Sequence, residues 1–390
     1  MDPIVIVSAF RTPFGKSNGK LKSLPSTALG SVVVRKVTEK VRDKVDAVIM
    51  GCVLVAGLGQ SPARQSIFGA GLSSSVRSLN VNKICGSGMA SIMLGVNDII
   101  AGEADIVVAG GMESMSNAPF LLDRAKVKDK TMANHELREI LVDHILHDGL
   151  VDAYEKCVMG IYAEDTAKMY TFSRDEQDEY ALKSCLKARK ATEDGSFARE
   201  IVPVALPNDT TWMDTDEIPF SFDLSRIKTL RPVFSPEGTI TAASASRVAD
   251  GAAAILLMRA SMANTLGVEP IARVVAQSSF SQDTQLFTTA PVGAIKLLLK
   301  KSGWQLADVD LFEINEAFAV VTMATMRDLE IDPESVNIFG GACAIGHPLG
   351  ASGARIVVTL LNALKTRNAK RGIAAMCVGG GEGVAMSFEI

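Results

Sequence analysis

The stretches VDAVIMGCVLVAG (residues 45–57) and VDLFEINEAFAVV (residues 309–321) begin alike and decide the fold. Each reads as a short buried strand that ends in a turn. Two more pairs of similar stretches follow, in the same order and about 260 residues apart: VNKICGSGMASIMLGVNDII (81–100) with FGGACAIGHPLGASGARIVVTLLNAL (339–364), and ADIVVAGGMESMS (104–116) with GIAAMCVGGGEGVAMSFE (372–389). Three matched pairs in one order predict two similar α/β halves.

Strand-like and helix-like runs alternate around these pairs, as in a sheet that is covered on both faces. We predict an N-terminal half of residues 1–118 plus 248–268 and a C-terminal half of residues 269–390. Each half alone would leave one layer uncovered, so the two should pack together. Residues 119–247 carry more charge and proline and should form a loop domain that covers a ligand. Ser173 is expected to cap a helix there.

The composition excludes several classes of protein. The chain has 390 residues, 47% of them hydrophobic, and a net charge of −4, with no long basic run, which argues against nucleic acid as a partner. We expect neither a signal peptide nor a membrane-spanning helix. Six single cysteines without a CxxC pair favour a reducing compartment over disulfides or structural zinc. The expected location is the cytoplasm, or an organellar matrix if a transit peptide has been removed.

Cys85 lies between a strand-like run and GSGMASIMLG, which has helical spacing. A thiol at a helix N-terminus should have a lowered pKa, and backbone N–H groups there can bind an oxyanion. This predicts a nucleophile. A small buried core cysteine is the alternative, and this stretch alone leaves the two open.

A nucleophilic cysteine needs a base, and the chain has four histidines. His135, His144 and His147 lie in the charged middle and read as solvated helix residues. His347 lies in a glycine-rich turn of the second half, which the repeat places opposite Cys85. His347 is therefore the predicted base.

Two more polar side chains stand where a strand ends. Cys377 enters the glycine-rich CVGGGEG, and Asn315 follows the strand-like DVDLFEI. Polar groups at strand ends are often functional. Together with Cys85 and His347 they form a candidate cluster of two thiols, one imidazole and one amide.

The stretches NKICGSGM, GGMESMS, MGIYAED, NEAF, GGACAIGHPLGASG and CVGGGEG, in this order, resemble the thiolase family over essentially the whole chain. The resemblance implies an α/β thiolase fold, with two similar βαβαβαββ halves in a five-layered α-β-α-β-α arrangement and an inserted loop domain. It implies acyl-CoA and coenzyme A as substrates and products, no metal or other cofactor, and a homodimer or homotetramer. The segment 121–147 is where we expect subunit contacts.

The resemblance also implies roles for the candidate cluster. Cys85 matches the nucleophile that carries the acyl group, His347 the base that activates it, and Cys377 the second acid/base. Asn315 matches the residue that holds a water at the enolate site, where His347 is the other donor. The backbone amides of Cys85 and Gly379 match a second oxyanion hole. The implied reaction is ping-pong: condensation of acetyl-CoA with an acyl-CoA, or thiolysis of a 3-ketoacyl-CoA.

Acetyl-CoA C-acetyltransferase is the leading subtype, and a degradative 3-ketoacyl-CoA thiolase of broader chain length is the alternative. The residues that match coenzyme A and substrate contacts are Ser246, Leu150, Met159, Phe234, Phe318, Ala242, Val158 and Arg247. Short-chain acetoacetyl-CoA thiolases usually have histidine where this chain has Val158, which allows longer or branched acyl chains. Arg247 could reach a phosphate, although a solvated side chain is favoured.

Two further departures from the family pattern have no assigned role. Glu382 replaces a glutamine, and Cys343 is an added thiol that is either silent or sensitive to oxidation. Three other classes of protein are disfavoured. A ketoacyl synthase is disfavoured by Cys377, and an inactive thiolase-like binding subunit by the filled catalytic positions. A cysteine hydrolase is disfavoured because no third group is expected to orient His347.

Overall fold

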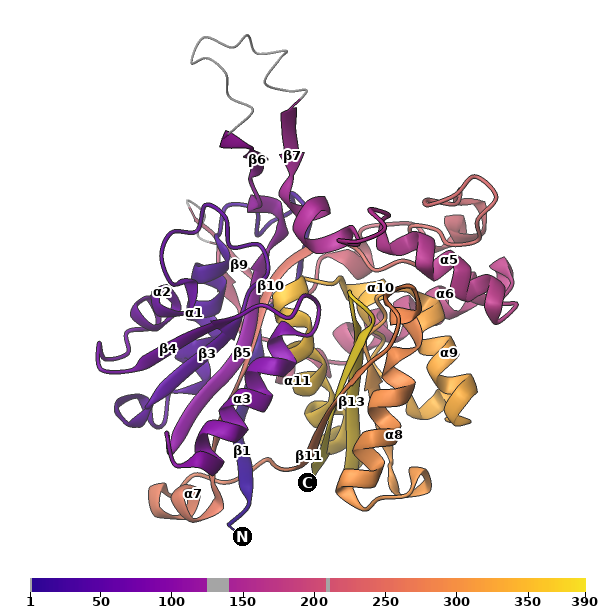
Figure 1. Cartoon of the computed structure of the whole chain (residues 1–390). Coiled ribbons are helices and arrows are strands. Elements are labelled where there is room, and N and C mark those ends of the chain that lie inside the picture. The colour runs from indigo at the N-terminus through magenta and orange to yellow at the C-terminus, as the bar shows by residue number, and fades with distance from the viewer. Residues whose placement is uncertain (1, 125–139, 208–210) are drawn as a thin grey trace, which may run out of the picture.

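The computed structural model describes residues 2–124, 140–207 and 211–390, and in it two α/β halves lie side by side (Figure 1). The N-terminal half has the strand order β4-β3-β5-β10-β1, and the C-terminal half β11-β14-β13-β12. Pairing of Val5 with Arg273 and Ile6 with Ala272 joins β1 to β11. The strands are β1 (Ile4–Arg11), β3 (Ala47–Gly51), β4 (Arg77–Val81), β5 (Ile106–Ser114), β10 (Ala249–Arg259), β11 (Ala272–Ser281), β12 (Leu311–Ile314), β13 (Arg371–Val378) and β14 (Glu382–Glu389), and the short β2 (Gly15–Lys16) pairs with β10.

Helices cover both faces of each half. The helices are α1 (Ser26–Val37), α2 (Pro62–Ala70), α3 (Ser87–Ala101), α7 (Ala260–Leu266), α8 (Ala290–Ser302), α9 (Ala319–Leu329), α10 (Ala342–Ile345) and α11 (Leu349–Arg367). Helices α3 and α11 pack on each other between the two halves, whereas α1 and α8 cover the outer faces. The predicted α-β-α-β-α layering is therefore confirmed. Strands β3 and β5 are buried throughout, because helices lie on both of their faces.

The two halves follow the same order of elements, with one difference. The N-terminal half runs β1-α1-β3-α2-β4-α3-β5-β10, and each strand position in this order is occupied by a full strand. In the C-terminal half the counterpart of β4 is a single parallel bridge between Phe312 and Val336. A 3₁₀ turn at Pro333–Ser335 precedes this bridge, and Asn337 follows it with φ +45°. The backbone is thus extended for too few residues to form a full strand.

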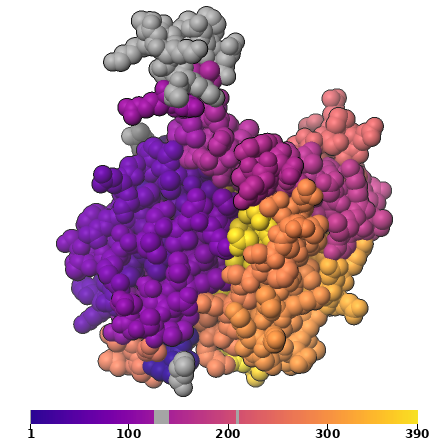
Figure 2. Space-filling model, in the orientation of Figure 1, coloured from indigo at the N-terminus to yellow at the C-terminus, as the bar shows by residue number. Residues whose placement is uncertain are grey.

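The segment between the halves lies across one end of both of them (Figures 1 and 2). It contains β6 (Phe120–Leu122), β7 (Leu141–Asp143), α5 (Met159–Met169), α6 (Arg174–Glu193), β8 (Val204–Ala205) and β9 (Trp212–Met213). Ser173 begins α6 with a capping box: its hydroxyl accepts from Glu176 N, and the Glu176 carboxylate accepts from Ser173 N. The expected N-cap is confirmed.

One described stretch, Ile84–Ala101, is long and apolar enough to cross a membrane. It contains α3, which packs between the two halves, so its apolar character is that of a core helix. This position matters for the site, because the N-termini of α3 and α11 meet near the end of the sheets that the loop domain covers.

Candidate active site

Helices α3 and α11 approach each other closely because glycine lies at their contact. A Cβ on Gly88 would stand 2.7 Å from the backbone nitrogen of Ala354, and a Cβ on Gly353 would stand 2.3 Å from that of Met89. No larger residue fits at either position without moving a backbone. The first turns of the two helices therefore pack backbone against backbone. The residues that come just before each helix are brought to the same place.

Those residues line one cavity of about 140 Å³ with largely apolar walls. The predicted site residues that line it are Cys85, His347, Gly379, Ser246, Leu150, Met159, Phe234, Phe318, Val158 and Arg247. Two aromatic rings meet edge to face on its wall, with the centroids of Phe234 and Phe318 5.7 Å apart. Ala242 is exposed and is not part of this lining.

Cys85 follows Ile84, whose φ of +46° lies in the left-handed region, so the chain turns sharply before α3. Burial raises the pKa of the Cys85 thiol to about 11, and the backbone amides of Gly379 and of Cys85 itself lower it by less. The Glu113 carboxylate raises it further. The predicted low pKa is wrong for the resting protein. Burial destabilises the thiolate form by more free energy than the helix N-terminus stabilises it.

His347 is held in one orientation by Ser352. The Ser352 hydroxyl donates to the Pro348 carbonyl at 2.9 Å, so its oxygen accepts from His347 Nδ1–H at 2.5 Å. His347 Nε2 therefore carries the free lone pair, and it has no partner among the described residues. Burial and the nearby Arg355 lower the pKa of His347 to about 3. The expectation that no group orients this histidine is wrong, because Ser352 does so.

Cys377 lies near the end of β13 and is fully buried; it does not line the cavity but belongs to the same apolar cluster as the cavity-lining Phe318. Burial raises the pKa of its thiol well above the ordinary value, and the neighbouring Cys85 raises it further. The resting site thus contains two neutral thiols and a neutral imidazole. A protonated thiol of this kind can serve as a proton donor.

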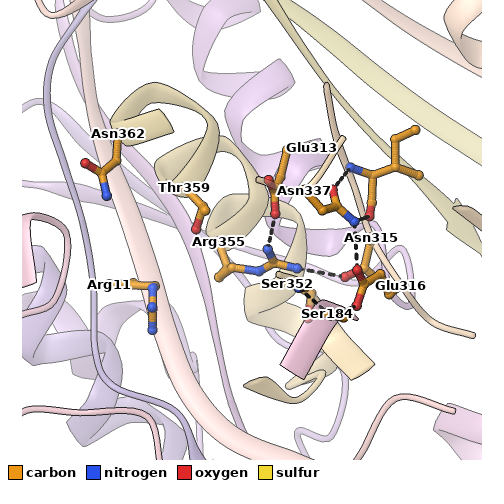
Figure 3. A network of polar contacts seen from close by, with 12 residues as sticks. Arg11, Ser184, Glu313, Asn315, Glu316, Asn337, Ser352, Arg355, Thr359 and Asn362 are labelled. Atoms are coloured by element: carbon orange, nitrogen blue, oxygen red, sulfur yellow. Dashed lines mark hydrogen bonds and ion pairs between the residues drawn. The ribbon is translucent and has the colours of Figure 1, made fainter. Parts of the chain in front are cut away.

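Asn315 comes directly after β12, and its side-chain orientation is fixed by an arginine (Figure 3). Arg355 Nη2 donates to Asn315 Oδ1 at 3.1 Å, and Arg355 Nη1 forms a 2.6 Å ion pair with Glu313. Because the guanidinium needs an acceptor, the Asn315 nitrogen must point the other way. That buried Nδ2 has no protein partner among the described residues, so it is available to a water.

The next residue, Glu316, holds this turn in place (Figure 3). Its buried carboxylate accepts from Tyr180 Oη at 2.9 Å, from Ser184 Oγ at 2.8 Å and from Asn337 Nδ2 and Cys343 N at 3.0 Å. It therefore fixes the turn after β12 to α6 and to α10, the helix before His347. Glu316 belongs to the stretch NEAF, and no role was predicted for it from the sequence.

Three of the departures from the family pattern now have a structural place. The Arg247 guanidinium carbon lies 4.3 Å from the centroid of the Phe222 ring, and the side chain is half-buried, so it is only partly solvated. Cys343 is 1% exposed, and burial raises its pKa well above the ordinary value, which fits a silent thiol. Glu382 forms an ion pair with Lys83, two residues before Cys85.

The middle histidines divide into three cases. His144 is buried, with its Nε2 3.1 Å from Asp148 Oδ2, so the solvated reading is wrong for it. His147 is exposed, as expected. His135 lies outside the described residues, as does much of the predicted subunit contact at 121–147.

The sequence analysis missed two residues that the structure brings to the site. Ser352 stands five residues after His347, and the helix that begins at Leu349 folds its hydroxyl back to the imidazole. Glu113 lies in the noted stretch GGMESMS, but its buried contacts come from residues far away in the sequence. The spacing of Ser352 was a usable signal, whereas Glu113 offered none.

Comparison with known proteins gives the family. The thiolase N-terminal domain model matches residues 4–261, and the thiolase C-terminal domain model matches residues 268–390. The chain belongs to the thiolase family. The predicted family and fold are confirmed, and the ketoacyl synthase and hydrolase alternatives are set aside.

Named relatives cover the whole chain. The acetyl-CoA acetyltransferase of Escherichia coli K12 is 46% identical over 396 residues, which is 100% of this chain and 99% of that protein. The crystal structure of the Bacillus anthracis acetyl-CoA acetyltransferase matches with a TM-score of 0.94 at 35% identity, covering 100% of this chain and 99% of that one. The Acat5 thiolase from Ascaris suum, solved in complex with coenzyme A, matches with a TM-score of 0.93 at 40% identity, covering 99% of each chain.

Proposed function

We propose that this thiolase is an acetyl-CoA C-acetyltransferase, which transfers acyl groups between coenzyme A and Cys85. One observation carries the proposal: Cys85, His347 and Gly379 line one apolar cavity. The relatives that share the whole chain carry the same activity in their names. An inactive binding subunit would not need these groups to meet.

The first step of thiolysis makes the acyl-enzyme. His347 Nε2 takes the Cys85 proton, and the sulfur attacks the keto carbon of the 3-ketoacyl-CoA. The C–C bond then breaks, the acyl group stays on Cys85 as a thioester, and the enolate of acetyl-CoA leaves. Its α-carbon receives the proton of the Cys377 thiol, whose raised pKa keeps that proton available. A water held by Asn315, together with His347, stabilises the enolate oxygen.

The second step releases the acyl group. The thiol of coenzyme A gives its proton to the Cys377 thiolate and attacks the acyl carbon, while Cys85 leaves and regains the proton from His347. The amides of Cys85 and Gly379 stabilise the oxyanion that forms, and one such donor is worth roughly 3–4 kcal/mol. Condensation is the reverse path. The resting thiol and imidazole are neutral because the pKa of Cys85 is raised and that of His347 is lowered. Substrate binding must therefore bring these two pKa values closer together before the proton can move.

Coenzyme A is substrate and product here, and no resident cofactor or metal is proposed. Its pantetheine would pass Ser246, Met159 and Phe234, which line the cavity. Ala242 is exposed, so it would meet only the outer part of the ligand. We propose a cytoplasmic location, for which the single, unpaired cysteines are the support, with free acyl-CoA and coenzyme A as partners.

We further propose that the chain assembles as a dimer or tetramer. Strand β4 is the open edge of the N-terminal half and carries an exposed apolar side chain, Leu79. The β6–β7 hairpin exposes Phe120, Leu122 and Leu141. Light scattering after gel filtration measures the state directly, and a mass of one chain would overturn the proposal.

Val158 decides how far the alternative of broader chain length applies. It lines the cavity where short-chain relatives are expected to carry histidine, so thiolysis should extend to longer or branched 3-ketoacyl-CoAs. Val158→His should lower kcat/KM for those substrates by roughly tenfold relative to acetoacetyl-CoA, because a polar side chain replaces apolar wall. The measurement is kcat/KM over a chain-length series. Highest activity on acetoacetyl-CoA in the wild type supports the acetyltransferase, and activity on none of the substrates overturns the enzyme reading.

A further inference from the structure

Glu113 is a buried carboxylate whose partners come from two separate parts of the chain. It lies in β5 and is fully buried. Its Oε2 accepts from Val53 N at 3.0 Å and from Gly350 N at 2.8 Å, and its Oε1 accepts from Leu54 N at 3.1 Å. The Cys52 thiol donates to Oε1 at 3.5 Å. Within the described residues, no lysine, arginine or histidine forms an ion pair with it.

These contacts place Glu113 at the start of the helix that follows His347. Helix α11 begins after Pro348, which supplies no side-chain cap. A carboxylate that accepts from Gly350 N therefore satisfies an amide at the helix N-terminus, where negative charge is also favourable. The cap comes from the other half of the molecule, which ties α11 to β5.

The same carboxylate also binds the loop against which Cys85 packs. Val53 and Leu54 belong to a buried apolar cluster against which Ile84 and Cys85 pack. Glu113 holds the amides of both residues. Glu113 thus fixes the position of residues 53–54, the loop against which Cys85 packs, relative to α11, the helix that follows His347. It does not itself line the cavity.

We propose that Glu113 is a positioning residue of the active site. It holds α11, the helix that follows His347, and the loop against which Cys85 packs in a fixed relative position. It touches no substrate and acts through the two catalytic side chains. The inference rests on the proposed function only for its steady-state readout. The reactivity of the Cys85 thiol tests it separately.

Glu113→Gln keeps the shape but places an NH₂ group against backbone N–H donors or the Cys52 thiol. We expect kcat for thiolysis to fall roughly 10- to 100-fold, as for other lost orienting partners. KM for the acyl-CoA should change less than about threefold, because the cavity wall is untouched. Alkylation of Cys85 by iodoacetamide should shift to lower pH, because a charge that opposes the thiolate is gone. The other titratable groups near this thiol, Cys377 and His347, remain.

Two further variants separate position from charge. Glu113→Asp keeps the charge but loses reach, so kcat should fall while the alkylation midpoint stays as in wild type. It also serves if the glutamine variant does not fold. Glu164→Gln is the matched control: Glu164 is 3% exposed and accepts from the amides of Thr239 and Ile240. It should lower Tm without moving the alkylation midpoint.

The outcomes are distinct. Slower turnover with a lowered alkylation midpoint in Glu113→Gln supports the positioning role. A lower Tm, with kcat within about twofold of wild type and the pH midpoint of alkylation unchanged, would make Glu113 merely structural and overturn the inference. An inactive wild type would instead reject the proposed function, and the alkylation measurements would still decide the case of Glu113.

Discussion

The turn after β3 and the turn after β12 occupy equivalent places in the two halves but are built from opposite kinds of residue. Strand β3 ends at Gly51, where a Cβ would stand 2.6 Å from the Ser87 carbonyl carbon and 2.8 Å from Gly350 O. Strand β12 is followed instead by Asn315, whose side chain is bound by Arg355.

The difference shows how one fold, used twice, makes a single site. The N-terminal half gives up a side chain at this turn, so that the helices of the nucleophile and the base can approach. The C-terminal half keeps polar side chains there and supplies the proposed base, the second thiol and the amide. Each half is incomplete without the other. Substitutions on the two sides should therefore affect different properties of the site.

Removing the nucleophile of the N-terminal half should have the largest effect. Cys85→Ala should reduce thiolysis by roughly 10⁴-fold or more, because no acyl-enzyme can form. Mass spectrometry after incubation with an acyl-CoA should show an acyl adduct on wild type and none on the variant. Cys185→Ala, which changes a buried thiol away from the cavity, is the control. An adduct that persists without Cys85 would reject this assignment of the nucleophile.

Disturbing the base of the C-terminal half should cost less. Ser352→Ala removes the acceptor of His347 Nδ1–H, so the imidazole can rotate or take the wrong tautomer. We expect kcat to fall roughly 10- to 100-fold with little change in KM. The measurement is steady-state thiolysis beside the rate of acylation in single turnover. Equal losses in kcat and in substrate affinity would point to a general disturbance of the cavity.

The last expected effect is on stability instead of rate: a pH dependence that originates in the C-terminal half. The pKa of His347 is about 3 in the folded protein and about 6.5 when unfolded. Between these values the unfolded chain binds a proton that the folded chain does not, so stability falls as pH falls from about 6.5. His347→Gln removes this titration. Denaturant unfolding at several pH values should show wild type losing more stability than the variant on acidification, and parallel losses would contradict it.

Much of the architecture was readable from the sequence because it depends on local pattern. The three repeated pairs predicted two α/β halves, and the capping signal at Ser173 was also correct. The shortened third strand of the C-terminal half was not visible. The shortening depends on the left-handed backbone of Asn337. No local sequence pattern predicted that conformation.

The site residues were found as types, but their chemical states were not. Cys85 and His347 stood out by their glycine-rich surroundings, and the structure brings both to one cavity. The helix N-terminus suggested a low pKa for Cys85, whereas the effect of burial could be seen only after the halves were packed together. Arg247 was likewise expected to be solvated, and only the folded chain shows that its guanidinium also stacks on Phe222.

The sequence by itself determined the family, the repeat and the candidates for the reactive side chains, because these follow from residue types at fixed spacing. Only the tertiary structure decided that the resting thiol and imidazole are neutral, that Ser352 orients His347 and that Glu113 joins the halves. Burial and hydrogen bonding depend on neighbours that are remote in the chain. Glu113 and Gly350 are 237 positions apart, and no local pattern connects them.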